Sequence, residues 1–206
     1  MQLNSLLINI VNHNILHAKW LNTLSFMENA GARKISAAEH KTEVTLLILK
    51  HAAEEHRHAY YLKKQLAKLD ENLCKTYSND ELLAPNYTRF YLNALDVQVC
   101  RYLKANFKLT GSDLKFAAYL FVTYAIEVRA DELYPIYQKV LTNNESKVTV
   151  KSIILEEEGH LEEMLKQLEE FIPAWELHAK QVIGIEQQMF NSWLIELERE
   201  VNSIVY

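Results

Sequence analysis

The sequence has few of the residues that interrupt helices, with only 4 Gly and 3 Pro among 206 residues. A β-sandwich or an α/β protein of this length needs many turns, and turns draw heavily on these two residue types. Their scarcity excludes those classes and favours a few long helices. The chain is also 49% hydrophobic and 24% charged, which is typical of a globular protein rather than a disordered one. We therefore expect one all-α domain over residues 1–206.

Three further absences restrict the partners and the compartment. The formal net charge is −5, whereas nucleic-acid-binding proteins usually carry a clustered basic excess, so we expect no nucleic-acid partner. No run approaches the roughly 18 apolar residues of a membrane span, so we expect no membrane partner. The stretch from Leu3 to Val11 lacks the basic start and cleavage site of a signal peptide. The 2 cysteines, Cys74 and Cys100, lie in no metal-binding spacing and are interpreted as reduced packing residues, so the expected compartment is the cytoplasm.

Apolar residues recur at helical spacing in six stretches. We expect helices over residues 6–35, 42–69, 88–106, 113–141, 147–172 and 174–201. Ser36 or Thr42 is the candidate N-cap of the second helix, and Ser112 that of the fourth. Pro135 is expected to kink the fourth helix near its end. Residues 71–87 are polar and contain turn-forming residues, which predicts a loop with at most one short turn.

Two of these helices carry a Glu-x-x-His pair on their apolar face. In steps of three or four residues, the apolar stripe of residues 42–69 includes Glu55 and His58, and that of residues 147–172 includes Glu157 and His160. Burying an unpaired carboxylate costs several kcal/mol, so such a group must be neutralised, paired or bound to a metal. Residues three apart on a helix lie about 5 to 6 Å apart, so both side chains of a pair can reach the same or adjacent ions.

Each pair is preceded by another acid on an apolar stripe. Glu28 lies 27 residues before Glu55, and Glu127 lies 30 residues before Glu157. Two residues on antiparallel neighbouring helices meet at one level when the turn lies midway between them. The midpoints fall between residues 41 and 42 and at residue 142, close to the two expected breaks. Both pairs are therefore expected to converge across helical hairpins.

One Glu from each of two helices, with Glu-x-x-His from each of two others, is the ligand pattern of di-iron and di-manganese carboxylate bundles. The motifs here are Phe-Met-Glu28-Asn-Ala-Gly-Ala, Glu55-His56-Arg57-His58, Ala-Ile-Glu127-Val-Arg and Glu157-Glu158-Gly159-His160. On these motifs the sequence resembles the ferritin-like di-iron carboxylate superfamily over about residues 6–172. The resemblance implies a four-helix bundle whose long crossover, between its second and third helices, contains an added helix. A further C-terminal helix covers about residues 174–201. The implied metal ligands are Glu28, Glu55, His58, Glu127, Glu157 and His160.

The resemblance also implies a function. It points to an oxidase or oxygenase with two iron ions, manganese being the alternative, that uses dioxygen or peroxide on a small organic substrate. Further partners compatible with this interpretation are an electron donor and a second copy of the chain as a homodimer. The alternatives are an iron storage or handling protein of ferritin-like type, a haem-oxygenase-like di-metal oxidase and a metal-free helical scaffold that binds a protein.

Other polar residues near the stripes have different expected roles. Tyr124 and Asp131 lie one turn before and after Glu127 and are candidates for orienting a ligand histidine or carboxylate. His17 and His51 share the apolar stripes and are interpreted as core residues.

The acids directly beside the two pairs are expected to be solvated. No histidine follows Glu54, Glu156 or Glu158 at the third position, and these residues lie off the apolar stripes. Replacing Glu54 or Glu158 by alanine is accordingly expected to leave metal binding unchanged.

Overall fold

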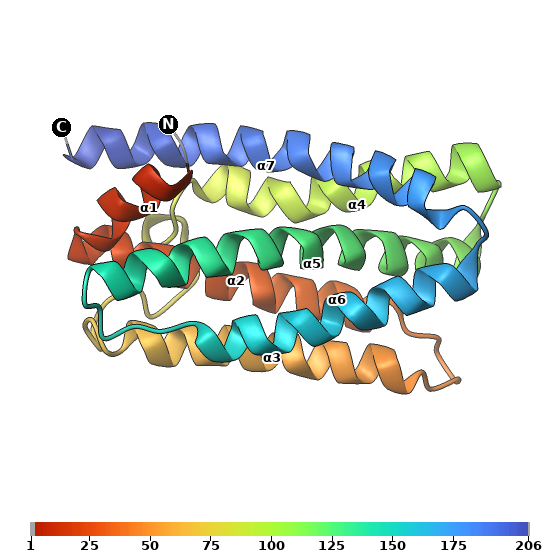
Figure 1. Ribbon diagram of the computed structural model, residues 1–206, viewed down its shortest axis with the longest axis horizontal. Helices are drawn as coiled ribbons and strands as arrows, with labels where there is room; N and C mark the ends of the chain where they lie inside the picture. The colour runs from red at the N-terminus through yellow and green to blue at the C-terminus, as the bar shows by residue number, and fades with distance from the viewer. Residues whose placement is uncertain (1–2, 206) are drawn as a thin grey trace.

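The computed structural model describes residues 3–205, and over that range it contains helices and connecting segments but no strand (Figure 1). The expected all-α class is thereby confirmed. The α-helices are α1 (Leu3–Val11), α2 (Asn14–Ala38), α3 (Leu46–Leu66), α4 (Pro85–Phe107), α5 (Gly111–Asn143), α6 (Lys151–Phe171) and α7 (Trp175–Val205), with a short 3₁₀ turn, η1 (Asn79–Glu81). Each helix in this range falls short of the apolar character needed to cross a bilayer.

Helices α2, α3, α5 and α6 lie side by side as two hairpins. Helix α2 packs along α3, and α5 packs along α6. Side chains join the two hairpins: the Tyr61 hydroxyl of α3 donates to the carbonyl of Thr149, just before α6, at 2.9 Å. Helices α4 and α7 pack on each other and on the side of α5 opposite α6 (Figure 1).

Aromatic side chains fasten α7 to the rest of the protein. Trp193 of α7 stacks on Trp20 of α2, with ring centroids 5.8 Å apart, and on Tyr91 of α4, at 6.0 Å. All three side chains are at most 2% exposed. Large buried aromatic rings contribute strongly to packing energy, so α7 is an integral part of the core and not a loosely attached extension.

The prediction of one continuous first helix is wrong, because Asn12 and His13 separate α1 from α2. His13 is in an extended conformation, with φ −119° and ψ 107°, and its Nδ1 accepts from the backbone N–H of Leu16 at 3.4 Å. The histidine therefore serves as the N-cap of α2. The polar run from Asn12 to Asn14 is the sequence signal for this break.

Other helix boundaries also differ from those expected. Helix α3 begins after Thr45, and neither Ser36 nor Thr42 caps it, because α2 continues past Ser36 to Ala38. Helix α5 begins after Thr110, so Ser112 lies inside the helix and is not its N-cap. The loop predicted for residues 71–87 ends earlier than expected, at Pro85.

Two prolines, Pro85 and Pro135, lie within helices, at positions that the backbone chemistry of proline allows. Pro85 occupies the first turn of α4, where a missing N–H costs nothing. Pro135 lies within α5, which continues to Asn143. Pro135 is exposed, so water can satisfy the carbonyl that loses its helical partner. The kink expected at Pro135 stays a prediction.

Candidate metal centre

Six acidic and histidine side chains from four helices meet in the interior. They are Glu28 from α2, Glu55 and His58 from α3, Glu127 from α5, and Glu157 and His160 from α6. One ligand atom from each forms two groups with atoms within 4.8 Å of one another, namely Glu28, Glu55, His58 and Glu157, and Glu55, Glu127, Glu157 and His160. The structure thus brings together all six residues for which the sequence predicts metal binding. Glu55 and Glu157 belong to both groups.

The cluster is almost completely shielded from water. Five of the six residues are 2% to 7% exposed, and Glu28 is half-buried. Four carboxylates in such surroundings are strongly unfavourable unless protons, cations or metal ions compensate their charge.

Two helical hairpins bring these residues to one level. Glu28 lies ten residues before the end of α2, and Glu55 lies nine residues after the start of α3, so they face each other across the turn. The second hairpin is less symmetrical, since Glu127 lies sixteen residues before the end of α5 and Glu157 only six after the start of α6. The connection of residues 144–150 runs back along the helices and makes up the difference (Figure 1). Glutamine side chains of α3 and α5 hold its backbone N–H groups.

Each histidine of the cluster is held by a glutamate from the opposite helix. Nε2 of His160 lies 2.8 Å from Oε2 of Glu54, and Nε2 of His58 lies 2.9 Å from Oε2 of Glu156. In both cases the glutamate directly precedes the Glu of the Glu-x-x-His pair, so α3 and α6 exchange equivalent contacts. A carboxylate can only accept, so Nε2 carries a hydrogen, and the other ring nitrogen, Nδ1, faces the cluster and offers it a lone pair whenever the imidazole is neutral.

These contacts overturn the expectation that the flanking acids are solvated. The side chain of Glu54 is only 18% exposed, and that of Glu156 is 35% exposed. Arg57 bridges the two, since its Nη2 lies 3.5 Å from Glu54 and 2.6 Å from Glu156. Sequence reasoning missed both residues. The signal that could have found them is the repetition of Glu-Glu-x-x-His on two helices, because it places an equivalent acid before each pair. Glu158, by contrast, is exposed as expected.

Three potential ligand atoms of the cluster lack hydrogen-bond partners within residues 3–205: Nδ1 of His58, Nδ1 of His160 and Oε2 of Glu127. Nδ1 of His58 lies 3.0 Å from Oε1 of Glu157, and Nδ1 of His160 lies 3.4 Å from Oε2 of the same residue, without hydrogen-bond alignment. A buried polar atom without a partner costs about 1 to 3 kcal/mol, and such atoms are rare in native proteins. All three belong to residue types that coordinate divalent metals.

The crowding of carboxylates also changes proton affinities. Burial, together with the negative charge of its neighbours, raises the pKa of Glu55 well above its usual value, and the pKa of Glu127 is raised in the same way. Burial alone would lower the pKa of His58 and His160, but the adjacent carboxylates outweigh it and raise these pKa values to about 8 and about 11. The pKa of Glu157 is lowered because its contacts with Glu127 and both histidines outweigh its burial. Without a metal, the cluster therefore retains protons that a metal ion would displace.

Tyr124 and Asp131 do not reach the cluster. The ring of Tyr124 packs edge-on against Trp175, at 6.0 Å and 86°, and Asp131 is exposed. Successive residues turn by about 100° around a helix, so both lie roughly 40° to 60° from Glu127, toward the same side. The cluster lies on the other side, where Tyr134 donates its hydroxyl hydrogen to the carboxylate of Glu28.

His17 and His51 are both buried core residues, as expected. Nε2 of His17 lies 2.7 Å from the Tyr137 hydroxyl. His51 contacts the hydroxyl of Tyr119 through Nδ1, at 2.8 Å, and Glu163 through Nε2, at 2.9 Å.

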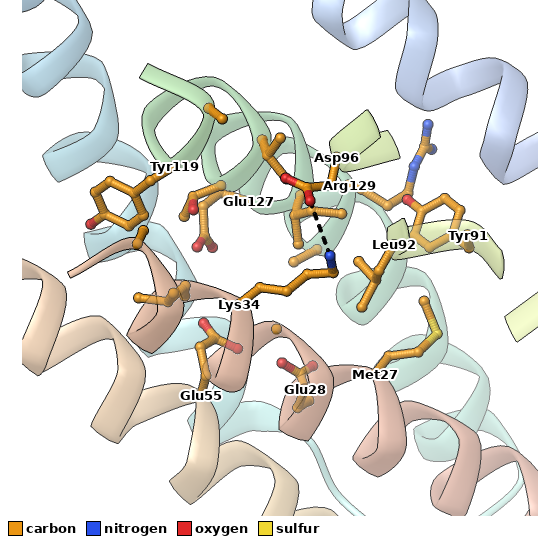
Figure 2. Close-up of a pocket in the computed structure, with 18 of the residues that line it drawn as sticks. Met27, Glu28, Lys34, Glu55, Tyr91, Leu92, Asp96, Tyr119, Glu127 and Arg129 are labelled. Carbon is orange, nitrogen blue, oxygen red and sulfur yellow. Dashed lines mark hydrogen bonds and ion pairs between the residues drawn. The ribbon is translucent and has the colours of Figure 1, made fainter. Parts of the chain in front are cut away.

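A cavity of about 360 Å³ adjoins the cluster between α2, α4, α5 and α7. Glu28, Glu55 and Glu127 line one part of it, and the remaining wall is mostly apolar (Figure 2). Lys34 of α2 and Asp96 of α4 form an ion pair across it, with Nζ and Oδ2 3.2 Å apart. Three glutamates of the cluster therefore border the cavity.

The cluster and the adjoining cavity are the features of the protein that bear on its function. No protein-family model, curated protein or solved structure matches this chain. The arrangement itself consists of buried carboxylate and imidazole ligands beside an apolar cavity, and it could hold a metal ion. Such an arrangement is suited to binding divalent cations next to an organic molecule.

Proposed function

We propose that the cluster binds two divalent metal ions and that the protein is a ferritin-like di-iron oxidoreductase, an oxidase or oxygenase acting on a small organic substrate. The observation that carries the metal site is the set of three buried ligand atoms without partners, on His58, His160 and Glu127. These atoms lie in a cluster that contains four carboxylates and is largely shielded from water. Metal coordination would satisfy these atoms and compensate the buried charge together.

The charges and the sharing of ligands favour two ions over one. Four ionised glutamates carry a charge of −4, and two divalent cations balance it while both histidines stay neutral, as ligation through Nδ1 requires. Glu55 and Glu157 belong to both ligand groups, so each would contribute to both metal positions. Glu28 and His58 would complete one position, and Glu127 and His160 the other.

The ligand types favour iron, with manganese as the alternative. Carboxylates are hard ligands and imidazole is a borderline one, whereas metals bound mainly by sulfur would need cysteines, and both cysteines lie outside the cluster. A pair of iron ions would supply the electrons needed to reduce dioxygen or peroxide. The chain's own contribution is to fix the ligands: Glu54 and Glu156 orient the histidines, and Tyr134 holds Glu28.

The ferritin-like assignment depends on the order of the ligands along the chain and on the helices that carry them. In this proposal α2, α3, α5 and α6 form the bundle, each contributing one Glu or one Glu-x-x-His pair. The connection from α3 to α5 is the long crossover and contains α4, and α7 is an addition.

The cavity favours catalysis over iron storage, and the buried ligand atoms argue against a metal-free scaffold. Storage requires a path for hydrated iron, whereas this cavity is mostly apolar and is bordered by three of the candidate ligand glutamates. A scaffold that binds only a protein has no use for buried ligand atoms without partners.

Anaerobic loading with ferrous iron followed by exposure to oxygen tests the proposed function. We expect uptake to saturate at about two irons per chain and oxygen to produce a near-ultraviolet and visible absorption that the metal-free protein lacks. Uptake of many irons per chain would instead indicate storage. Protein that binds no iron, or binds it without any reaction with oxygen, would contradict the proposal.

A further inference from the structure

The cavity beside the cluster has a mostly apolar wall and few charged groups. Its apolar lining includes Met27 and Leu24 from α2, Leu92 from α4, Ile126 and Leu133 from α5, and Trp193 from α7. Its volume of about 360 Å³ equals the liquid volume of about a dozen water molecules. Apart from the cluster glutamates, the charged side chains in its lining are those of Lys34, Asp96, Lys115 and Arg129. An occupant of matching chemistry would be largely apolar, with a small polar head.

Arg129 is not available to such an occupant, because its guanidinium is fully engaged. It forms a bidentate pair with Glu186, at 2.9 and 2.8 Å, and also donates to Gln187 and Glu132. The guanidinium also lies over the ring of Phe190, 3.9 Å from its centroid. Arg129 and Glu186 are both buried and neutralise each other. The head group of an occupant must therefore be recognised by the other charged residues of the lining.

Lys34 is the residue best placed to recognise that head group. Its side chain is 32% exposed, and its ammonium has three donor hydrogens but only one ion-pair contact among the described residues, with Asp96 at 3.2 Å. Figure 2 shows the pair reaching across the cavity. Lys34 lies six residues after Glu28, less than two turns along α2, and both line the cavity. A molecule held by Lys34 would thus lie along the wall that leads to the cluster.

The balance of charge selects an anion over a cation. Lys34 and Lys115 provide two positive charges in the lining, against the single negative charge of Asp96. Arg129 and Glu186 cancel, and the cluster glutamates cancel against the two metal ions of the proposed site. A protonated amine would meet excess positive charge, whereas a carboxylate would compensate it and could share the Lys34 ammonium with Asp96 or displace Asp96 from it.

We propose that this cavity binds a monocarboxylic acid with an apolar body, whose carboxylate pairs with Lys34. The proposal concerns the substrate of the same site and depends on the proposed function for its chemical role. Lys34 and the apolar wall lie outside the ligand set, so binding of the acid is measured by a different assay from metal uptake, and its failure is distinguishable from failure of the proposed function.

A series of ligands with one body and three head groups tests the proposal. Octanoate, 1-octanol and octylamine are titrated calorimetrically into the full-length protein, once as purified and once after iron loading. We expect octanoate to bind most tightly, about tenfold more tightly than 1-octanol, which is the usual value of a charge-assisted hydrogen bond. Tightest binding of octylamine, equal binding of all three ligands, or no binding of octanoate would overturn the proposal.

Substitutions of the two partners of the ion pair are expected to change octanoate affinity in opposite directions. Lys34→Gln should weaken octanoate binding by about tenfold and leave 1-octanol binding unchanged. Asp96→Asn should strengthen octanoate binding, because the carboxylate that competes for Lys34 is removed. Lys139→Gln, which replaces an exposed lysine of α5 outside the cavity lining, is the control. An identical octanoate affinity in Lys34→Gln and Lys139→Gln would refute the assigned anchor.

Gly31 allows an independent steric test. It lines the cavity between Glu28 and Lys34, and a Cβ added there would meet no atom within 4 Å. Gly31→Leu should therefore fold normally, since leucine is a better helix former than glycine, while its side chain occupies the cavity. We expect octanoate binding to fall at least tenfold in this variant, and retention of full affinity in a folded Gly31→Leu protein would count against the cavity as the binding site. If octanoate binds as expected but the protein takes up no iron, the cavity proposal stands and the proposed function fails.

Discussion

Replacing Glu54 or Glu156 by alanine removes a carboxylate that is not itself among the candidate ligands. Glu54 contacts Nε2 of His160 at 2.8 Å, and Glu156 contacts Nε2 of His58 at 2.9 Å. Loss of either contact frees the imidazole to rotate and makes its Nδ1 less basic. We expect each substitution to weaken metal binding even though all six candidate ligands stay in place.

The size of the effect follows from the type of contact. Hydrogen bonds to a charged group contribute about 1.5 to 3 kcal/mol. Groups that orient a metal-bound histidine typically contribute 10- to 100-fold in metal affinity, or roughly 1.4 to 2.7 kcal/mol. Glu54 should have the larger effect, because its side chain is 18% exposed whereas that of Glu156 is 35% exposed and more screened by water. Glu54→Gln keeps an acceptor but loses the charge and should fall between wild type and Glu54→Ala.

Competition between the protein and a chelator for Mn²⁺, at fixed pH, measures these affinities. Glu158→Ala is the matched control, because Glu158 is an exposed neighbour of Glu157 on the same helix. Far-ultraviolet circular dichroism verifies that each variant is folded. If the Mn²⁺ affinity of folded Glu54→Ala equals that of Glu158→Ala within about twofold, the reasoning about histidine orientation is refuted.

Two further predictions concern stability outside the cluster. Burial lowers the pKa of His17 from 6.5 to about 4, so the unfolded chain takes up a proton at higher pH than the folded protein does. Stability should be lost as pH falls from about 6.5 to 4, by up to about 3 kcal/mol. In urea titrations at pH 6.5 and pH 4, His17→Gln should lose less stability on acidification than the wild type, whereas the exposed control His56→Gln should lose as much as the wild type; equal losses in the two variants would refute this. Glu186→Ala leaves Arg129 buried without its main partner and should lower the free energy of unfolding by about 3 to 5 kcal/mol, and a loss no greater than that of the exposed control Glu132→Ala would contradict this role.

The sequence was most informative about features that depend only on the geometry of a single helix. The pairs Glu55 with His58 and Glu157 with His160 share a helix face because of the 3.6-residue period, and the hairpins bring them together with Glu28 and Glu127. Helix boundaries were less predictable. The break at His13 depends on one side-chain cap, and the late start of α6 depends on glutamine side chains that hold residues 144–150.

Contacts between helices could not be deduced from periodicity alone. Glu54 and Glu156 lie off the apolar stripes, and their roles arise only because α3 and α6 pack with a particular relative rotation. Helix packing also explains why Tyr134 and Tyr124 of α5 differ in their neighbours. Tyr134 reaches Glu28, whereas Tyr124 packs on Trp175. A helical wheel places a residue on a face, but the neighbour that the face meets is set by tertiary packing.

The metal content of the purified protein, measured by mass spectrometry after iron loading and removal of unbound metal, tests the central claim most directly. The account predicts about two ions per chain in the wild type, as in dinuclear carboxylate bundles, and a clear loss in His58→Ala and Glu157→Ala but not in Glu158→Ala. Wild-type protein without stoichiometric metal, or folded His58→Ala and Glu157→Ala proteins that both retain their full metal content, would contradict it.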